Sequence, residues 1–179
     1  MAINILEKTD NYLLRFSTDE QICPWEKRMV DLREFITALS ERGWLRRLDV
    51  EIDPSWEIGA ICRENFNRHG PALLFSQIRG FTTPLVAGVL GSLESYALAL
   101  GCDPSLPEIS AKWEKAFASP LKARIGNSGK APCREVRLKE VNLYADPFPV
   151  PKWHLLDGGP ELGTFHGVVT MDPDTGWIN

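Results

Sequence analysis

Between residues 30 and 118, stretches with helical hydrophobic spacing alternate with short strand-like stretches, and this order limits the possible folds. Residues 30–42 repeat apolar side chains every three or four positions, and Asp31 can cap the helix with Glu34 as its partner. Residues 45–52 alternate apolar and charged side chains, as a half-buried strand does. The predicted order is helix, strand, helix, strand, strand, helix, helix, which indicates a small α/β domain.

The predicted elements have definite bounds and predicted buried faces. Helices are predicted at residues 30–42, 56–68, 92–101 and 109–118, and strands at residues 45–52, 72–78 and 85–90. In the first strand we expect Leu48, Val50 and Ile52 to share one buried face. The other two strands do not alternate, so both are expected to be covered on two faces. Five tryptophans are expected to pack in the core or at its edge: Trp44, Trp56, Trp113, Trp153 and Trp177.

The character of the chain changes near residue 120. A Gly-, Pro- and Lys-rich stretch suits a linker, and the three prolines of YADPFPVP require an extended, irregular connection. Strands are predicted at 133–141 and 165–171, followed by a tight Asp-Pro-Asp-Thr-Gly turn. The returning strand stops at Asn179, so we expect further polypeptide to complete this region. The predicted organisation is an extension at 1–28, an α/β domain at 29–120, and a linker with an incomplete second domain at 121–179.

Composition excludes several classes of protein. Hydrophobic residues make up 44% of the 179 residues and charged residues 25%, the balance of a globular protein. The net charge of −4 and the lack of a basic block argue against a nucleic-acid partner. No apolar run reaches the roughly 18 residues that span a bilayer, and no secretory signal is visible, so a cytoplasmic location is expected. The four cysteines form no CxxC pair, which predicts scattered reduced thiols and argues against a zinc site.

Polar residues near a glycine pair are the first candidates for a site. Asp146, His154 and Asp157 lie close in sequence to Gly158 and Gly159, and glycines let a backbone approach a ligand closely. The alternative is that Asp157 and the glycines form an ordinary turn and that His154 is a packed or hydrogen-bonded histidine. No GxGxxG or GxxxxGK[ST] motif is present, so no phosphate loop is predicted.

Several blocks of the sequence, in order, resemble the UbiD family. The first is DLREFITALSERGWLRRLDVEIDPSWEIGAICREN, followed by GPALLFSQIRG and PLVAGVLGSLESYALALG. The last, FPVPKWHLLDGGPELGTFHGVVTMDPDTGWIN, is similar to the segment where the family enters its flavin-binding domain. The resemblance runs from about residue 30 to the end, and it implies that the second region begins a split β-barrel.

The resemblance implies an activity and a cofactor. UbiD enzymes decarboxylate aromatic or α,β-unsaturated carboxylic acids, reversibly, with prenylated FMN, a divalent ion that is Mn2+ or Mg2+, and often K+. Asn179 matches a ligand of that metal, and an amide oxygen is a hard donor that suits such ions. Thr164 matches a position near the cofactor and substrate. The family's catalytic Glu-Arg-Glu set and its other metal ligands lie beyond Asn179, so no catalytic residue is expected within this chain.

The expected partners follow from the same resemblance. They are the remainder of the decarboxylase, as a continuation or a companion chain, together with prenylated flavin and a small carboxylic acid; the complete enzyme is expected to be a homo-oligomer. Two other functions remain open. One is a non-catalytic assembly or binding subunit that keeps the family architecture, and the other is an ordinary FMN-binding oxidoreductase of split-barrel type. The sequence does not select a particular acid.

Overall fold

A central α/β unit dominates the part of the chain that the structure describes. The computed structural model describes residues 31–121, 135–140, 142, 145, 147–163 and 166–178. Its elements are α1 (Leu32–Glu41), β1 (Leu45–Ile52), α2 (Glu57–Asn67), β2 (Ala72–Ile78), β3 (Leu85–Ala87), α3 (Leu93–Leu100) and α4 (Leu106–Ala118). The predicted order of elements and the α/β class are confirmed.

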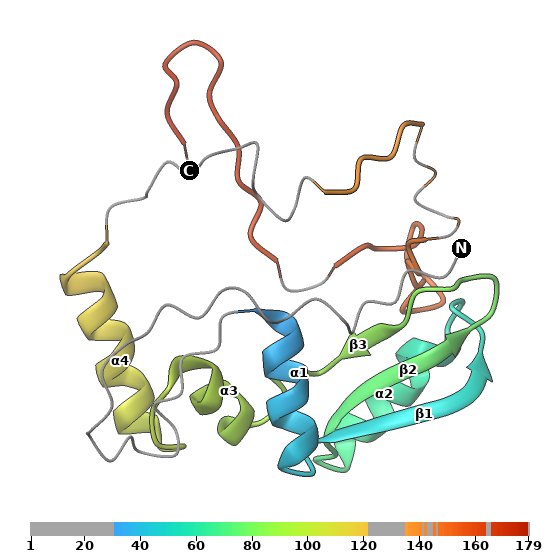
Figure 1. The fold of residues 1–179 in the computed structure, drawn as a ribbon, viewed down its shortest axis with the longest axis horizontal. Helices are drawn as coiled ribbons and strands as arrows, with labels where there is room; N and C mark the ends of the chain where they lie inside the picture. The colour runs from blue at the N-terminus through green and yellow to red at the C-terminus, as the bar shows by residue number, and fades with distance from the viewer. Residues whose placement is uncertain are drawn as a thin grey trace.

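The three strands form one mixed sheet in the order β1-β2-β3 (Figure 1). β1 and β2 are parallel, joined by the crossover helix α2, and Leu45 pairs with Ala72 at the start of the register. β3 returns antiparallel to β2, with Phe75 paired to Leu85. The central position of β2 explains its apolar sequence, since both of its faces are covered by other elements.

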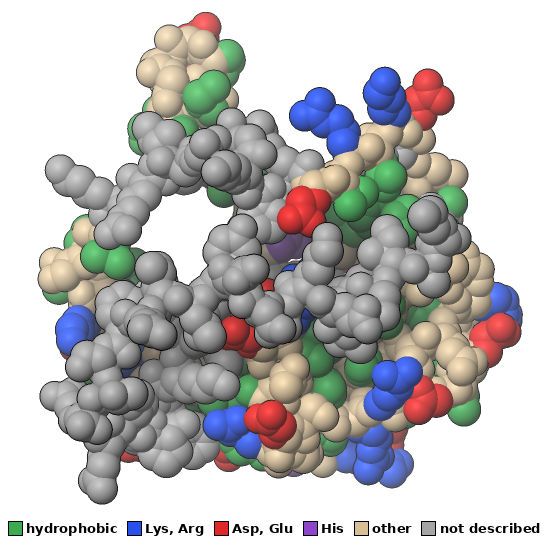
Figure 2. Space-filling view, viewed as in Figure 1, with side chains coloured by type: hydrophobic (Ala, Val, Ile, Leu, Met, Phe, Trp, Pro, Cys, Tyr) green, Lys and Arg blue, Asp and Glu red, His purple; other side chains and the backbone are tan. Residues whose placement is uncertain are grey.

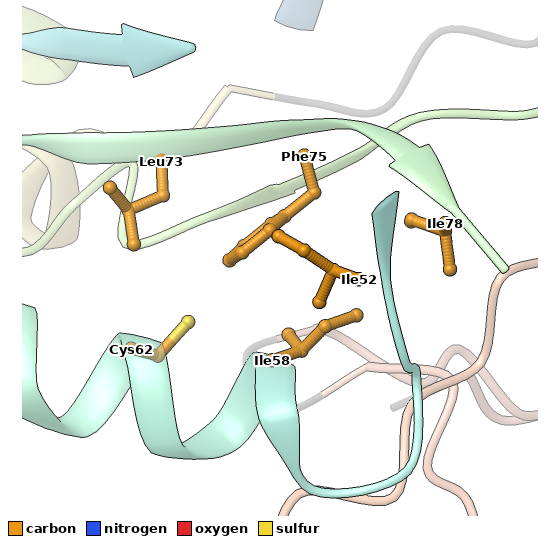
Figure 3. Close-up of a cluster of buried hydrophobic side chains, with 6 residues drawn as sticks. All are labelled: Ile52, Ile58, Cys62, Leu73, Phe75 and Ile78. Atoms are coloured by element: carbon orange, nitrogen blue, oxygen red, sulfur yellow. The ribbon is translucent and has the colours of Figure 1, made fainter. Parts of the chain in front are cut away.

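Adjacent residues of β2 enter two different hydrophobic clusters. On one face Leu73 and Phe75 pack with Ile58 and Cys62 of α2, and Figure 3 shows these side chains pointing toward one another between helix and sheet. On the opposite face Ala72 packs with side chains of α1 and α3. Helices therefore cover both sides of the sheet, as the lack of alternation in the β2 sequence predicted.

One residue of β1 contradicts the predicted buried face. Ile52 is buried and Leu48 is half-buried, but Val50 is 65% exposed. The register with β2 shifts between Leu48 and Glu51, where β1 contains one residue more than its partner strand. Such a bulge interrupts the regular alternation of side chains, and here it leaves Val50 exposed while Leu48 and Ile52 pack against the same cluster.

Local capping chemistry sets the ends of the helices. The Asp31 carboxylate accepts from the Glu34 N–H at 3.0 Å, and the Ser92 hydroxyl accepts from the Ser95 N–H at 3.1 Å. Gly101 ends α3 with φ of 66°, a left-handed conformation that suits glycine. α4 begins at Leu106, earlier than predicted, because Ser105 caps it. β3 is shorter than the predicted 85–90 strand, since the backbone turns at Gly88 with φ of 70°.

The second region differs from its predicted strands. Residues 135–140 and 166–170 form no strand, and the described pairing of the hairpin is a single antiparallel bridge between Met171 and Ile178. The predicted turn is confirmed, because the Gly176 N–H donates to the Asp172 carbonyl at 2.9 Å. Among the described residues of the hairpin, the strand pairing begins at Met171, so the alternating pattern of residues 166–170 does not become a strand.

The aromatic and thiol predictions are confirmed in part. Trp44 and Trp153 are half-buried and pack against the two clusters. The other three tryptophans are exposed and do not serve the core: Trp56, Trp113 and Trp177. Cys62 and Cys102 are free, buried thiols. Among the described residues, no helix combines the length and apolarity needed to cross a membrane.

Candidate functional site: the segment docked on helix α2

Residues 150–161, here called the docked segment, return to the N-terminal unit and pair with its backbone. The Trp56 N–H donates to the Lys152 carbonyl at 2.9 Å, and the Lys152 N–H donates to the Pro54 carbonyl at 3.1 Å. Ser55 and Lys152 thus form a parallel bridge between distant parts of the chain. Val150 and Pro151 are buried. The prolines of this segment prevent a helix, but its unblocked N–H groups still pair with the N-terminal unit.

A glycine within α2 allows the docked segment to lie directly against the helix. A Cβ atom at Gly59 would overlap the backbone carbonyl of Trp153, so no larger residue fits there in this arrangement. The Trp153 ring packs against the cluster that contains Ile58 and Cys62. Its indole nitrogen is buried and has no acceptor among the described residues. The docking is therefore close and mainly apolar at Trp153.

A pocket of about 570 Å³ lies between α2 and the docked segment. Its lining is Gly59, Cys62, Arg63, Phe66 and Asn67 from α2, and Trp153, His154, Asp157 and Glu161 from the docked segment. Apolar groups line part of it, and one guanidinium, one carboxamide, one imidazole and two carboxylates line the rest. The combination of an apolar wall with a few polar groups is typical of binding pockets.

Arg63, His154 and Asp157 form a chain of polar contacts at this pocket. Arg63 Nη2 lies 2.8 Å from His154 Nε2, and a guanidinium can only donate, so Nε2 accepts and the proton resides on Nδ1. Nδ1 faces Asp157 Oδ2 at 3.5 Å, and the same oxygen accepts from the His154 N–H at 2.8 Å. Asp157 therefore holds the turn that presents His154, and His154 connects the docked segment to α2.

The thiol in the pocket is not a nucleophile. Burial raises the pKa of Cys62 to about 11, because the thiolate loses hydration in the apolar cluster. At neutral pH the group is almost entirely protonated, and its sulfur packs as a small hydrophobic side chain. Among the described residues, no group of three or more His, Cys, Asp or Glu side chains could hold a metal ion.

The structure brings only some of the sequence candidates together. His154 and Asp157 meet in one turn, as the alternative interpretation of that motif expects, while Gly158 and Gly159 face open space. Thr164, Asn179 and Asp146 lie outside the described residues. Sequence reasoning missed Gly59 and Arg63. Gly59 had a usable signal, since a glycine inside a helical pattern often marks close packing.

The turn before Asn179 is built by the residues that the sequence singled out. The Asp172 carboxylate accepts from the N–H groups of Asp174 and Thr175, each at 2.8 Å. These backbone donors, with Thr175 contributing most, lower the pKa of Asp172 below its usual 3.8. The Asp172 N–H donates to the Trp177 carbonyl at 2.8 Å and starts the return of the chain. Asn179 follows this return by two positions.

Two family models match the chain. Residues 36–113 match the 3-octaprenyl-4-hydroxybenzoate carboxy-lyase N-terminal domain, and residues 124–179 match the Rift-related domain of the same carboxy-lyase. The first covers most of the α/β unit, and the second covers the docked segment and the hairpin. The two matches place the α/β unit and the docked segment in the N-terminal part of one protein family. The chain belongs to the UbiD family of decarboxylases and corresponds to its N-terminal portion.

Individual relatives agree with this membership. Phenolic acid decarboxylase of Sedimentibacter hydroxybenzoicus is 33% identical over 153 residues, and the match covers 80% of this chain and 31% of the relative. Ferulic acid decarboxylase 1 of Saccharomyces cerevisiae is 31% identical over 163 residues, and the match covers 84% of this chain and 32% of the relative. A solved structure of the UbiD-class enzyme HmfF from Pelotomaculum thermopropionicum, in complex with prFMN, superposes with a TM-score of 0.67 at 27% identity. The superposition covers 82% of this chain and 33% of the HmfF chain. The chain spans about a third of the length of these proteins.

Proposed function

We propose that this chain is the N-terminal part of a decarboxylase that acts reversibly on an aromatic or α,β-unsaturated carboxylic acid with prenylated FMN. The family membership carries the proposal, because the relatives act on phenolic and ferulic acids and one solved relative holds prFMN. The chain supplies the α/β domain, residues 29–120, and the start of the flavin-binding domain, residues 121–179. The gap between the two family models supports a boundary near residue 120.

Within this chain, Thr164 and Asn179 are the proposed cofactor-binding residues, and Asn179 is the proposed metal ligand. The amide oxygen of Asn179 is a hard donor, and its chemistry fits Mn2+ or Mg2+, with K+ as a further ion. The ordered turn at Asp172 supports a defined path of the chain into Asn179. Prenylated FMN supplies, when bound, the electron sink that makes loss of CO2 feasible. The residues of this chain bind and orient the group.

One amide ligand does not hold a divalent ion at useful affinity by itself, so the activity belongs to the assembled enzyme. The assembly consists of this chain with the remainder of the decarboxylase, as one polypeptide or two, and we propose that it is oligomeric and cytoplasmic. Eight exposed apolar side chains among the described residues of 155–178 support a further contact of this surface in the assembled enzyme. They are Leu155, Leu156, Leu162, Val168, Val169, Met171, Trp177 and Ile178.

The test compares Asn179→Ala with unchanged enzyme in the assembled form. We expect Asn179→Ala to weaken Mn2+ retention at least about tenfold and to lose decarboxylation of phenolic or ferulic acids in parallel. Asn179→Asp keeps an oxygen donor and should retain the metal better. Asn11→Ala, outside both family models, is the matched control. Full decarboxylation by residues 1–179 alone, or unchanged Mn2+ binding in Asn179→Ala, would contradict the proposal.

A further inference from the structure

We propose that Arg63 and His154 are positioning residues that lock the docked segment on α2 and thereby set how the following chain, from Thr164 to Asn179, approaches the flavin and its metal. The inference deepens the proposed function and rests on it. Arg63 lies in the α/β unit and His154 in the region that precedes the proposed cofactor residues, so their contact joins the two regions directly.

The start of the docked segment is fixed by groups other than this pair. Two backbone hydrogen bonds hold Lys152 beside Pro54 and Trp56, and Trp153 lies against Gly59 in a position that leaves no room for a Cβ atom. These contacts are buried or made by the backbone, so they determine where the segment attaches. They do not determine how the loop beyond Trp153 is rotated about that attachment.

Among the described residues, the loop beyond Trp153 has few other contacts that could set its rotation. Leu155 and Leu156 are exposed, and Gly158 and Gly159 have open space around them. The loop closes on itself, because the Glu161 N–H donates to the Pro151 carbonyl at 3.0 Å. The chain that leaves the loop toward Thr164 therefore starts beside the point where the loop began. Its direction depends on the loop's orientation.

Among the residues that the structure describes, the Arg63–His154 contact is the side-chain hydrogen bond that joins this loop to α2. Asp157 holds His154 in place from within the loop, with the His154 N–H donating to its carboxylate at 2.8 Å. Arg63 Nη2 then donates to Nε2 of His154 at 2.8 Å. Both Arg63 and His154 are exposed, so neither contributes to the hydrophobic core. Their loss should disturb the orientation of the loop without unfolding the domain.

The experiment measures FMN binding with MnCl2 present, together with the melting temperature, in the assembled enzyme. Arg63→Met and His154→Leu remove the donor and the acceptor, and each should weaken FMN binding about three- to tenfold at an unchanged melting temperature. His154→Gln keeps an amide oxygen that can accept from Arg63, so binding should return to within about twofold of the unchanged enzyme. Arg68→Met is the matched control, since Arg68 pairs with Glu64 on the same helix.

Each outcome decides the inference. The inference is overturned if Arg63→Met and His154→Leu bind FMN as tightly as the unchanged enzyme. It is also overturned if His154→Gln does not restore binding, or if Arg68→Met loses binding to the same extent. A loss that only tracks a lower melting temperature shows a purely structural role and also overturns it. If the unchanged enzyme neither binds FMN nor decarboxylates acids, the proposed function itself fails. If the unchanged enzyme does both and the variants show no loss, only the inference about Arg63 and His154 fails.

Discussion

Gly59 is the position in α2 where one added carbon atom would collide with the backbone of the docked segment. Alanine favours a helix by roughly 1 kcal/mol over glycine, but here its Cβ would overlap the Trp153 carbonyl, which is backbone and cannot rotate away. We expect Gly59→Ala to lower the free energy of unfolding by about 1–3 kcal/mol, measured by urea denaturation. Gly158→Ala, with nothing within 4 Å of its added carbon, should stay within about 0.5 kcal/mol. Equal effects of the two changes would show that the docked segment does not press on α2.

Cys62 provides a test of the buried cluster by pH. Burial raises the folded pKa of Cys62 to about 11, above the ordinary thiol value of 9.0, so the folded chain keeps a proton that the unfolded chain releases. The resulting stability is fully present below pH 9 and is lost as pH rises through about 11. We expect native Cys62 to resist iodoacetamide at pH 8.5 and to react once urea unfolds the domain, measured by peptide mass mapping. Rapid alkylation of the native thiol would mean that the pocket opens widely.

At the scale of elements, the turn at Asp172 should respond to acid. The backbone N–H groups of Thr175 and Asp174 lower the pKa of the Asp172 carboxylate. The ionised carboxylate therefore stabilises the turn at pH values above 3.8, its pKa in the unfolded chain, and this stability is lost as the pH falls through the lower folded pKa. We expect the amide NMR signals of residues 174 and 175 to titrate with a midpoint below pH 3.8. Asp172→Asn keeps an acceptor for the same N–H groups and should remove the titration. A midpoint at or above 3.8 would contradict the described hydrogen bonds.

The helices were predictable because their signals are local. Asp31 and Ser92 are caps within one turn of the residues they bind, and Gly101 marks an end by its own backbone conformation. Val50 was not predictable, because the bulge depends on how β1 meets β2, and the residues alone do not specify that register. The strand predictions at 133–141 and 165–171 were wrong within their described residues for a related reason. An alternating pattern forms a strand only when a neighbour pairs with it.

The site was less predictable than the fold. The hydrogen bond between Arg63 and His154 joins residues far apart in the sequence, and neither residue belongs to a sequence motif that predicts the other as its partner. Gly59 offered a signal, but a glycine in a helix does not say what approaches it. Thr164 and Asn179 came from family resemblance, lie outside the described residues, and stay predictions.

For the whole molecule, exposed apolar side chains predict self-association of the isolated chain. Leu156 is 93% exposed and Val169 is 78% exposed, and Figure 2 shows hydrophobic side chains on the projecting hairpin. We expect residues 1–179 to bind a hydrophobic dye and to grow in apparent mass with concentration. The double change Leu156→Gln and Val169→Thr should reduce both, with stability altered by less than about 0.5 kcal/mol. The matched control is Thr83→Gln, a change at an exposed polar position.

Light scattering and dye fluorescence check this expectation. A monomeric, dye-silent chain would show that these side chains are already covered in solution. If the proposed assembly is correct, addition of the remainder of the polypeptide should suppress dye binding, because the contact would bury the same surface.

The bridge between Ser55 and Lys152 also sets an order of events during synthesis. Its partners are roughly one hundred residues apart, so closing that loop costs entropy that neighbouring contacts do not. The βαβ unit can form as soon as β2 leaves the ribosome, whereas residues 150–161 must wait for their own translation. Until then the groove beside Gly59 is open to other chains, and a slow stretch of translation near residue 160 would lengthen that exposure.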